Sequence, residues 1–294
     1  MLEPGSDAAK RLALQKSVVD QLDVFVWPAV HSALGVLRAA RGCDVVTTQD
    51  PFWRGLLGLV AARASGARLN VQVHADLDGQ PFWRAWLAQF VLKQADRVRV
   101  VSQRVGRALP PTKAKVSVLP IYIDLAPFNN IVRHPHPQFA KTLLWIGRFE
   151  AEKDPLQALV ILEGVRRAGI DAGLVMLGDG SLGEALRTQA KQMSLPVQFP
   201  GWQNPIEFLS VADVVLSTSK YESYGASVVE SLAAGVPVVS FDVGVARDAG
   251  AQIVEDAESM TQAVVQILTS PMSGVLQLSV LPKQEWAQQW KNTL

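Results

Sequence analysis

The sequence is poor in several features that define whole classes of protein. Cys43 is its single cysteine among 294 residues, which excludes an internal disulfide and an all-cysteine metal cluster. The longest apolar runs, such as Leu56–Ala62, are far shorter than the roughly 20 residues that a membrane-spanning helix needs. Residues 1–11 contain no apolar segment of the kind found in signal peptides. We therefore expect a cytoplasmic protein, with peripheral contact to the inner face of a membrane as the further option.

Composition and charge indicate a globular protein with two unlike halves. Hydrophobic residues make up 49% of the chain and charged residues 19%, which suits a folded α/β protein of two domains. Residues 1–130 hold 16 Lys and Arg against 10 Asp and Glu, whereas residues 131–294 hold 12 against 17. The basic first half indicates an anionic partner, such as a membrane surface or a phosphorylated acceptor. Ordinary variation between two domains is the alternative interpretation.

Short apolar segments rich in β-branched residues alternate with helical patterns along the chain. Alternation of this kind, repeated in both halves, predicts an α/β fold with two parallel sheets and right-handed crossovers. The predicted strands are Val24–Trp27, Asp44–Thr48, Leu69–His74, Val98–Ser102, Val116–Leu119, Thr142–Ile146, Gly173–Leu177, Val197–Phe199, Val214–Ser217 and Val236–Phe241. The predicted helices are Ala8–Gln21, His31–Arg41, Phe52–Ala64, Phe82–Ala95, Asp154–Ala168, Ser181–Met193, Asn204–Ala212, Gly225–Ala234 and Ala257–Leu268.

A segment rich in Pro and Asn, 128–140, interrupts this alternation and predicts a linker between domains 1–128 and 141–294. The second domain opens with a buried strand that leads into the turn at Gly147. The first domain opens directly with a helix, so we expect that it lacks its first strand. A parallel strand buried on both faces contributes much of a core. We therefore expect the first domain to be the less stable of the two.

The densest group of polar residues lies at 217–237, where a strand, a polar turn and a helix follow one another. Glu222 precedes the helix and Glu230 lies within it. Their carboxylates would accept hydrogen bonds from sugar and ribose hydroxyls, and amides at the helix start suit a phosphate. Those amides belong to Tyr224, Gly225 and Ala226. The alternative is that Glu222 caps the helix and Glu230 is an ordinary surface residue.

The spacing of these residues resembles that of the retaining GT-B glycosyltransferases of family 4. The shared features are Glu222 and Glu230 with seven residues between them, Gly225 three positions after the first, and Ala-Ala-Gly-Val-Pro-Val-Val after the second. Further matching segments are Gly147–Lys153, Gly178–Ser181, Phe199–Trp202, Thr48–Gly55, Val71–Asp76 and Ala95–Ser102. The resemblance implies a GT-B fold, in which two Rossmann-like domains face a central cleft.

The resemblance also implies an activity and a set of roles. The protein would move a sugar from a nucleotide-diphosphate-sugar donor to a hydroxyl acceptor, namely a glycan, a lipid-linked acceptor or a polysaccharide precursor, with retention of configuration. The implied donor site comprises Gly147, Arg148 and Lys153 at the diphosphate, Trp202 near the base, Glu230 at the ribose, and Glu222 with the amides of Tyr224, Gly225 and Ala226 at the sugar and phosphate. The implied acceptor side places His74 beside the anomeric centre and Asp50 and Asp76 in the lining loops.

The predictions for cofactors and partners are mostly negative. Asp76 and Asp78 could hold Mg²⁺ against a diphosphate, but members of the resembled family need no metal, so we predict no essential metal, no cofactor and no nucleic-acid partner. Gly178, Gly180 and Gly183 match the glycine pattern of dinucleotide-binding turns. The acidic residue expected about 20 positions later is missing from residues 196–206, which disfavours NAD binding.

Two further questions stay open at this stage. The helix 82–95 carries aromatic residues at helical spacing, and we expect them to face the core, with contact to an anionic membrane as the alternative. The alternatives to sugar transfer are a GT-B sugar-nucleotide epimerase and a degenerate sugar-nucleotide-binding protein without turnover. The epimerase needs an acid/base set that the sequence does not supply.

Overall fold

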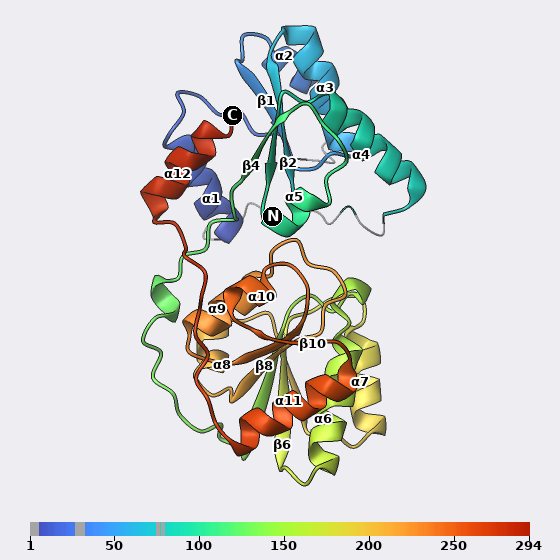
Figure 1. Ribbon diagram of the computed structural model, residues 1–294, viewed down its shortest axis with the longest axis vertical. Coiled ribbons are helices and arrows are strands. Elements are labelled where there is room, and N and C mark those ends of the chain that lie inside the picture. The colour runs from blue at the N-terminus through green and yellow to red at the C-terminus, as the bar shows by residue number, and fades with distance from the viewer. Residues whose placement is uncertain (1–5, 27–32, 75–76, 78–79) are drawn as a thin grey trace. The chain divides into compact units, whose positions relative to one another are not determined.

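The computed structural model describes residues 6–26, 33–74, 77 and 80–294 of the chain. It divides into two compact units (Figure 1): an N-terminal unit of Met1–Ile123 with Val280–Leu294, and a C-terminal unit of Asp124–Ser279. Each unit is built around its own parallel sheet. The predicted α/β class with two parallel sheets is therefore confirmed.

The described strands of the N-terminal unit form a parallel sheet in the order β1-β2-β3-β4. These strands are β1 (Val45–Thr48), β2 (Arg68–Val73), β3 (Arg97–Val100) and β4 (Lys115–Val118). The helices of this unit are α1 (Asp7–Lys16), α2 (Ala33–Ala39), α3 (Trp53–Ser65), α4 (Phe82–Gln94), α5 (Gln103–Arg107) and α12 (Lys283–Asn292). Helices α3 and α4 lie on one side of the sheet, and α1 and α12 lie on the other (Figure 1).

The two faces of this sheet differ in chemistry because side chains alternate along each strand. Leu69, Val71 and Val73 of β2 are buried apolar residues, as expected for the face toward α3. Asn70 and Gln72 alternate with them and are also fully buried. Thr47 of β1 lies between their amides, donating to Asn70 Oδ1 at 3.0 Å and accepting from Gln72 Nε2 at 2.8 Å. One face of the sheet is therefore a buried polar layer, held together by hydrogen bonds.

The end of the chain covers this polar layer. Asn70 Nδ2 donates to the carbonyl oxygen of Thr293 at 2.6 Å, and Trp286 Nε1 donates to that of Pro120 at 2.8 Å. Trp286 and Trp290 pack with Leu14 in a small apolar core between α1 and α12. This packing corrects the predicted domain boundary, which assigned 280–294 to the C-terminal domain.

Two other expectations for the N-terminal unit concern the predicted strand Val24–Trp27 and the stability of the unit. The predicted strand Val24–Trp27 is wrong for residues 24–26, which form no strand and are exposed; Trp27 lies outside the described residues. Among the described strands, β1 pairs with β2 and with no other strand, so β1 is an edge strand of this sheet. The lower stability of this unit stays a prediction.

The C-terminal unit contains a parallel sheet in the order β10-β9-β8-β5-β6-β7. Its strands are β5 (Lys141–Ile146), β6 (Ala172–Leu177), β7 (Val197–Gly201), β8 (Val214–Ser217), β9 (Val238–Phe241) and β10 (Gln252–Val254). Its helices are α6 (Pro155–Arg167), α7 (Gly183–Gln192), α8 (Pro205–Leu209), α9 (Ala226–Ala233), α10 (Ala246–Ala249) and α11 (Ala257–Thr269), with short 3-10 turns at Ala126–Phe128 and Ala151–Lys153. The central strands β5, β6 and β8 supply much of the core, as near-continuous apolar runs do in parallel sheets.

Docking of α12 yields a stability prediction. Trp290 is 1% exposed, so Trp290→Ala should destabilise the N-terminal unit by about 3–5 kcal/mol, the usual effect of removing a large buried aromatic side chain. Trp83→Ala on α4 is the matched control, because Trp83 is largely exposed and its loss should change the unfolding free energy by less than about 0.5 kcal/mol. Urea denaturation followed by fluorescence measures both. Equal effects of the two substitutions would contradict the assignment of α12 to the N-terminal core.

Candidate functional site

The strand order of the C-terminal unit reverses at one point of its sheet. Counted along the chain of this unit, the order is 3-2-1-4-5-6 from β7 to β10, with the reversal between β5 and β8. Open parallel sheets bind ligands at the carboxyl ends of the strands beside such a reversal. The turns that follow β5 and β8 contain Gly147–Lys153 and Thr218–Gly225. These are the two segments that the sequence predicts to hold a donor.

An ion pair joins these two turns. Lys153 Nζ contacts Glu222 Oε1, and Ser219 Oγ donates to the same oxygen at 3.1 Å. The side chains of Lys153 and Glu222 are only 19% and 15% exposed. Two opposite charges that are largely removed from water depend on each other, because the loss of one leaves the other poorly compensated. The structure thus brings together the predicted diphosphate cation and the predicted sugar-binding carboxylate.

Thr218 fixes the backbone around this pair. Its buried hydroxyl accepts from Trp145 Nε1 at 2.9 Å and lies 3.0 Å from the carbonyl oxygen of Lys153 and 2.9 Å from that of Asp154. The amide of Lys220 donates to the carbonyl oxygen of Glu152 at 2.9 Å. The turn after β8 is therefore bonded directly to the turn after β5. Sequence reasoning missed Thr218, although a polar residue directly after a buried apolar strand was the available signal.

Helix α9 begins at the same edge of the sheet. Gly225 precedes it with φ of 96°, a left-handed conformation that glycine adopts without strain. Tyr224 is buried, and its carbonyl oxygen accepts from the amide of Val245 at 2.8 Å; burial raises the pKa of the Tyr224 hydroxyl. The first amides of a helix have no partner within the helix, so those of Ala226 and Ser227 at the start of α9 can bind an anion.

The remaining donor-site residues lie on neighbouring segments. Arg148 is exposed and pairs with Glu152 through Nη2 and Oε1 at 2.8 Å. Trp202 is exposed directly after β7. Glu230 lies within α9 and is half-buried. Arg148 and Trp202 are thus accessible, and Lys153 is engaged by Glu222.

The glycine pattern at 178–183 serves backbone packing. A Cβ on Gly178 would lie 1.8 Å from the carbonyl oxygen of Gly147, and one on Gly180 would lie 2.7 Å from that of Phe149. Both glycines have positive φ, of 147° and 157°. The turn after β6 therefore packs against the turn after β5 more closely than any side chain allows. This close approach accounts for Gly178 and Gly180 without a dinucleotide.

His74 follows β2 in the N-terminal unit and contacts a buried arginine. Arg99 of β3 places Nη2 3.1 Å from His74 Nε2. Burial, with the charges of Arg99 and then Arg11, lowers the pKa of His74 to about 3. His74 is therefore neutral at physiological pH. Sequence reasoning missed Arg99, although an arginine within Val98–Ser102, a strand predicted to be buried, was a signal.

The predicted acceptor-side aspartates have different outcomes. Asp50 accepts from the amide of Phe52 at 2.9 Å and pairs with Arg54 at 3.1 Å, so its carboxylate already makes local bonds at the start of α3. Asp76 lies outside the described residues, as does Asp78. Within the described ranges, no three His, Cys, Asp or Glu side chains come together as a metal site.

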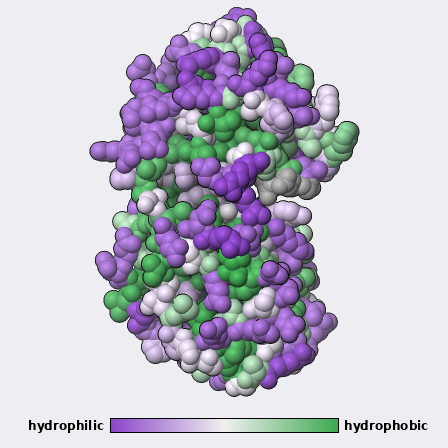
Figure 2. Space-filling model, in the orientation of Figure 1, coloured by the Kyte–Doolittle hydropathy of each residue, from purple (hydrophilic) through white to green (hydrophobic). Residues whose placement is uncertain are grey.

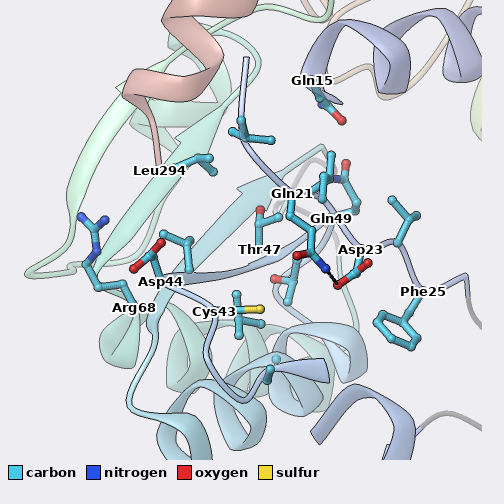
Figure 3. Close-up of a pocket in the computed structure, with 18 of the residues that line it drawn as sticks. Gln15, Gln21, Asp23, Phe25, Cys43, Asp44, Thr47, Gln49, Arg68 and Leu294 are labelled. Carbon is cyan, nitrogen blue, oxygen red and sulfur yellow. Dashed lines mark hydrogen bonds between the residues drawn. The ribbon is translucent and has the colours of Figure 1, made fainter. Parts of the chain in front are cut away.

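A groove of about 1220 Å³ lies within the N-terminal unit (Figure 3). The close-up labels Thr47 and Asp44 of the β1 region on one side and Gln21, Asp23 and Phe25 on another, with Gln21 Nε2 donating to Asp23 Oδ2 at 2.9 Å. Arg11 and His74 also line this groove. The groove is therefore accessible beside the edge strand β1.

Helix α4 does not bury its aromatic residues, contrary to the expectation that they face the core. Phe82 is 86% exposed, Trp83 53%, Trp86 59% and Phe90 42%. Leu87, Val91 and other residues of the opposite face supply the buried contacts instead. Hydrophobic residues accordingly reach the surface at the right-hand edge of the N-terminal unit (Figure 2), where α4 lies in the same view.

Comparison with known proteins agrees with this geometry. Residues 140–270 match the family model of the glycosyl transferases group 1. The chain is 29% identical over 245 residues to the alpha-monoglucosyldiacylglycerol synthase of Streptococcus pneumoniae, covering 74% of this chain and 55% of that protein. It is 31% identical over 230 residues to the glycogen synthase of Mycobacterium tuberculosis, covering 74% and 51%. The chain thus spans about half the length of these curated relatives.

Among solved structures, Anabaena HepE in complex with UDP-glucose superposes with a TM-score of 0.73 at 17% identity, covering 96% of this chain and 84% of that chain. At such identity the likeness concerns the fold, which is the GT-B arrangement of two Rossmann-like domains. The family match, residues 140–270, lies within the C-terminal unit, which contains the turns after β5 and β8. The family match is thus confined to the unit with the Lys153–Glu222 pair, whereas the likeness in fold extends over 96% of the chain.

Proposed function

We propose that this protein transfers a sugar from a nucleotide-diphosphate-sugar donor to a hydroxyl acceptor with retention of configuration, as a member of family 4. The observation that carries the proposal is the position of Lys153, Glu222 and the start of α9 at the reversal of strand order between β5 and β8. A cation and helix-start amides at this edge suit the diphosphate oxygens of such a donor, and the carboxylate suits its sugar hydroxyls.

The ion pair suggests how the donor is accepted. Because Lys153 and Glu222 are largely buried together, a ligand that takes Lys153 alone leaves the carboxylate without its cation. A sugar nucleotide offers phosphate oxygens to Lys153 and hydroxyls to Glu222, so it replaces both halves of the pair. A nucleoside diphosphate without sugar replaces only one half. We infer that the pair favours the intact donor over the free diphosphate.

Departure of the diphosphate builds negative charge on its oxygens. Lys153, Arg148 and the amides of α9 would stabilise that charge, each by a few kcal/mol for a preorganised donor. Arg148 would exchange Glu152 for phosphate, a change that its exposed position allows. Attack by the acceptor from the same face of the sugar, without a protein nucleophile, would give retention. No essential metal is needed in this scheme, because the two cations neutralise the leaving group.

The acceptor is proposed to be lipid-linked and to be met at a membrane surface. Helices α3 and α4 contain four basic residues and no acidic one, namely Arg54, Arg63, Arg84 and Lys93. Exposed aromatic side chains beside basic residues suit an anionic lipid interface. The similarity to an alpha-monoglucosyldiacylglycerol synthase supports a lipid acceptor. In the described chain, the helices fall short of the length and apolar character that crossing a bilayer requires, so the proposed contact is peripheral.

The overall proposal is tested by incubating the full chain with radiolabelled UDP-, GDP- and ADP-sugars in the presence of anionic lipid vesicles and lipid acceptors. We expect one donor to give labelled lipid. Epimerised donor in place of labelled lipid would identify an epimerase, and binding of donor without product would identify a protein without turnover.

Arg148→Ala should weaken binding of the nucleoside diphosphate by about 1.5–3 kcal/mol, the contribution of a hydrogen bond to a charged group. Arg167→Ala is the matched control, since Arg167 is an exposed arginine of the same unit that pairs with Glu163 on α6. Isothermal titration calorimetry measures both. Unchanged affinity of Arg148→Ala for every diphosphate tested would contradict the assigned role.

The two glutamates should respond differently to removal of charge. Glu222→Gln should lower kcat more than it raises KM, because the lost contact is to the reacting sugar, whereas Glu230→Gln should mainly raise the donor KM. Glu222→Gln should also tighten binding of the free nucleoside diphosphate, because Lys153 loses its competing carboxylate. Steady-state kinetics and calorimetry measure these effects. Full activity of both variants would show that the spacing of the two glutamates is unrelated to the donor.

Membrane contact by α4 predicts sedimentation with phosphatidylglycerol vesicles and not with phosphatidylcholine vesicles at low salt. A variant with Trp83→Ala, Trp86→Ala and Phe90→Ala should lose most of this binding. Trp202→Ala, which removes an exposed tryptophan of the other unit, should retain it. Equal sedimentation of the triple variant and the wild type would exclude the aromatic face of α4 as the contact.

A further inference from the structure

In the hydrogen bond between Arg99 and His74, the donor and the acceptor can be assigned. Gln72 of β2 pairs with Arg99 of β3 in the sheet register, so the Arg99 side chain lies next to the end of β2, where His74 follows. Arg99 Nη2 is 3.1 Å from His74 Nε2. A guanidinium only donates hydrogen bonds. His74 Nε2 must therefore be the acceptor, and the ring proton of the neutral histidine must be on Nδ1.

Arg99 has little freedom to relinquish this contact. It is 2% exposed, and its Nε and Nη1 atoms are shielded from solvent and have no hydrogen-bond partner within the described structure. The bond from Nη2 to His74 is the one side-chain hydrogen bond that Arg99 makes there. Breaking it would leave a buried guanidinium with still fewer partners, which is costly. The geometry therefore keeps the histidine ring in a single orientation.

The surrounding charges keep this histidine neutral. Those that act on it in the described structure are Arg99 on β3 and Arg11 on α1. Burial, and then Arg11, lowers the pKa of Arg99 to about 9, so Arg99 is still protonated at neutral pH. A protonated His74 would add a third cation to a buried site. His74 is therefore poorly suited to accept a proton as a general base near pH 7.

We propose that Arg99 is a positioning residue, which fixes His74 as the Nδ1–H tautomer so that its Nδ1–H donates a hydrogen bond to an oxygen of a bound ligand. This inference rests on the proposed function, which would supply the ligand whose oxygen accepts the hydrogen bond. His74 is half-buried and is among the residues that line the groove of the N-terminal unit, while its Nε2 is held by Arg99. The assignment gives His74, which the family resemblance places beside the anomeric centre, the role of a neutral, preoriented hydrogen-bond donor.

The wild-type protein provides the first test. Two-bond ¹H–¹⁵N correlation spectra of the ¹⁵N-histidine-labelled full chain distinguish the two tautomers and the imidazolium, and the spectrum of His74→Gln assigns His74 among the four histidines. We expect the Nδ1–H pattern for His74, unchanged between pH 8 and pH 5. An Nε2–H tautomer, or titration of His74 within this range, would overturn the proposal.

Three variants separate positioning from charge. Arg99→Met should leave His74 as a mixture of tautomers and lower kcat by about 10- to 100-fold with little change in donor KM, somewhat less than the loss of a whole preorganised donor. Arg99→Lys keeps a donor for Nε2 and should restore the Nδ1–H pattern and part of the activity. Arg11→Gln removes a charge but not the contact, and should leave the tautomer unchanged. A folded Arg99→Met with an unaltered Nδ1–H pattern would refute the positioning role.

The spectra need no sugar donor, so the two proposals can fail separately. An Nδ1–H pattern in the wild type and its loss in Arg99→Met support the positioning by Arg99 even if no radiolabelled sugar is transferred, in which case the proposed function fails. Sugar transfer by a protein whose His74 shows the Nε2–H tautomer would uphold the function and refute the positioning.

Discussion

The bond network between the turns after β5 and β8 is the interaction on which the candidate donor site depends. Thr218 accepts from Trp145 and lies against two carbonyl oxygens of the β5 turn, and these bonds bring Lys153 within reach of Glu222. The side chains of Lys153 and Glu222 are both largely removed from water, so each needs the other to compensate its charge. The site is therefore preorganised by the backbone, and its two charges compensate each other until a ligand of matching chemistry replaces both.

The N-terminal unit treats buried charge in a different way. Its sheet has a polar face on which Thr47 is hydrogen-bonded to Asn70 and Gln72, and Asn70 also donates to the carbonyl oxygen of Thr293. Arg99 also lies on this face, and its pKa is lowered by burial and then by Arg11, with no carboxylate in the described structure to raise it. Compensation by an opposite charge is absent there within the described structure, and directional hydrogen bonding takes its place. Such an arrangement favours a fixed neutral histidine over a titrating one.

The sequence was informative where local patterns determine structure. Strand and helix alternation predicted both parallel sheets. The family resemblance implied that the segments at Gly147 and Glu222 belong to one donor site, and the carboxyl ends of parallel strands do share one edge. It failed where packing decides between two faces of the same element. The aromatic residues of α4 have helical spacing whichever way the helix is turned, and only contact with α3 shows that Leu87 and Val91 face inward. The position of α12 was equally hidden, because a helix with two tryptophans can pack on either unit.

Some site residues can be found from the sequence and others cannot. The difference depends on whether a residue belongs to a sequence pattern or is explained only by its neighbour in space. Lys153 and Glu222 are recognisable because their spacing resembles that of a known family, and their chemistry suits a charged ligand. Arg99 belongs to no such pattern, and its significance comes from a neighbouring strand in register with its own. A charged residue on a buried parallel strand is costly unless it is bonded, so its retention there requires a partner. For Arg99 that partner is His74, the residue that the family resemblance places beside the reacting carbon. The cost of burying this arginine is thus linked to the orientation of one imidazole ring.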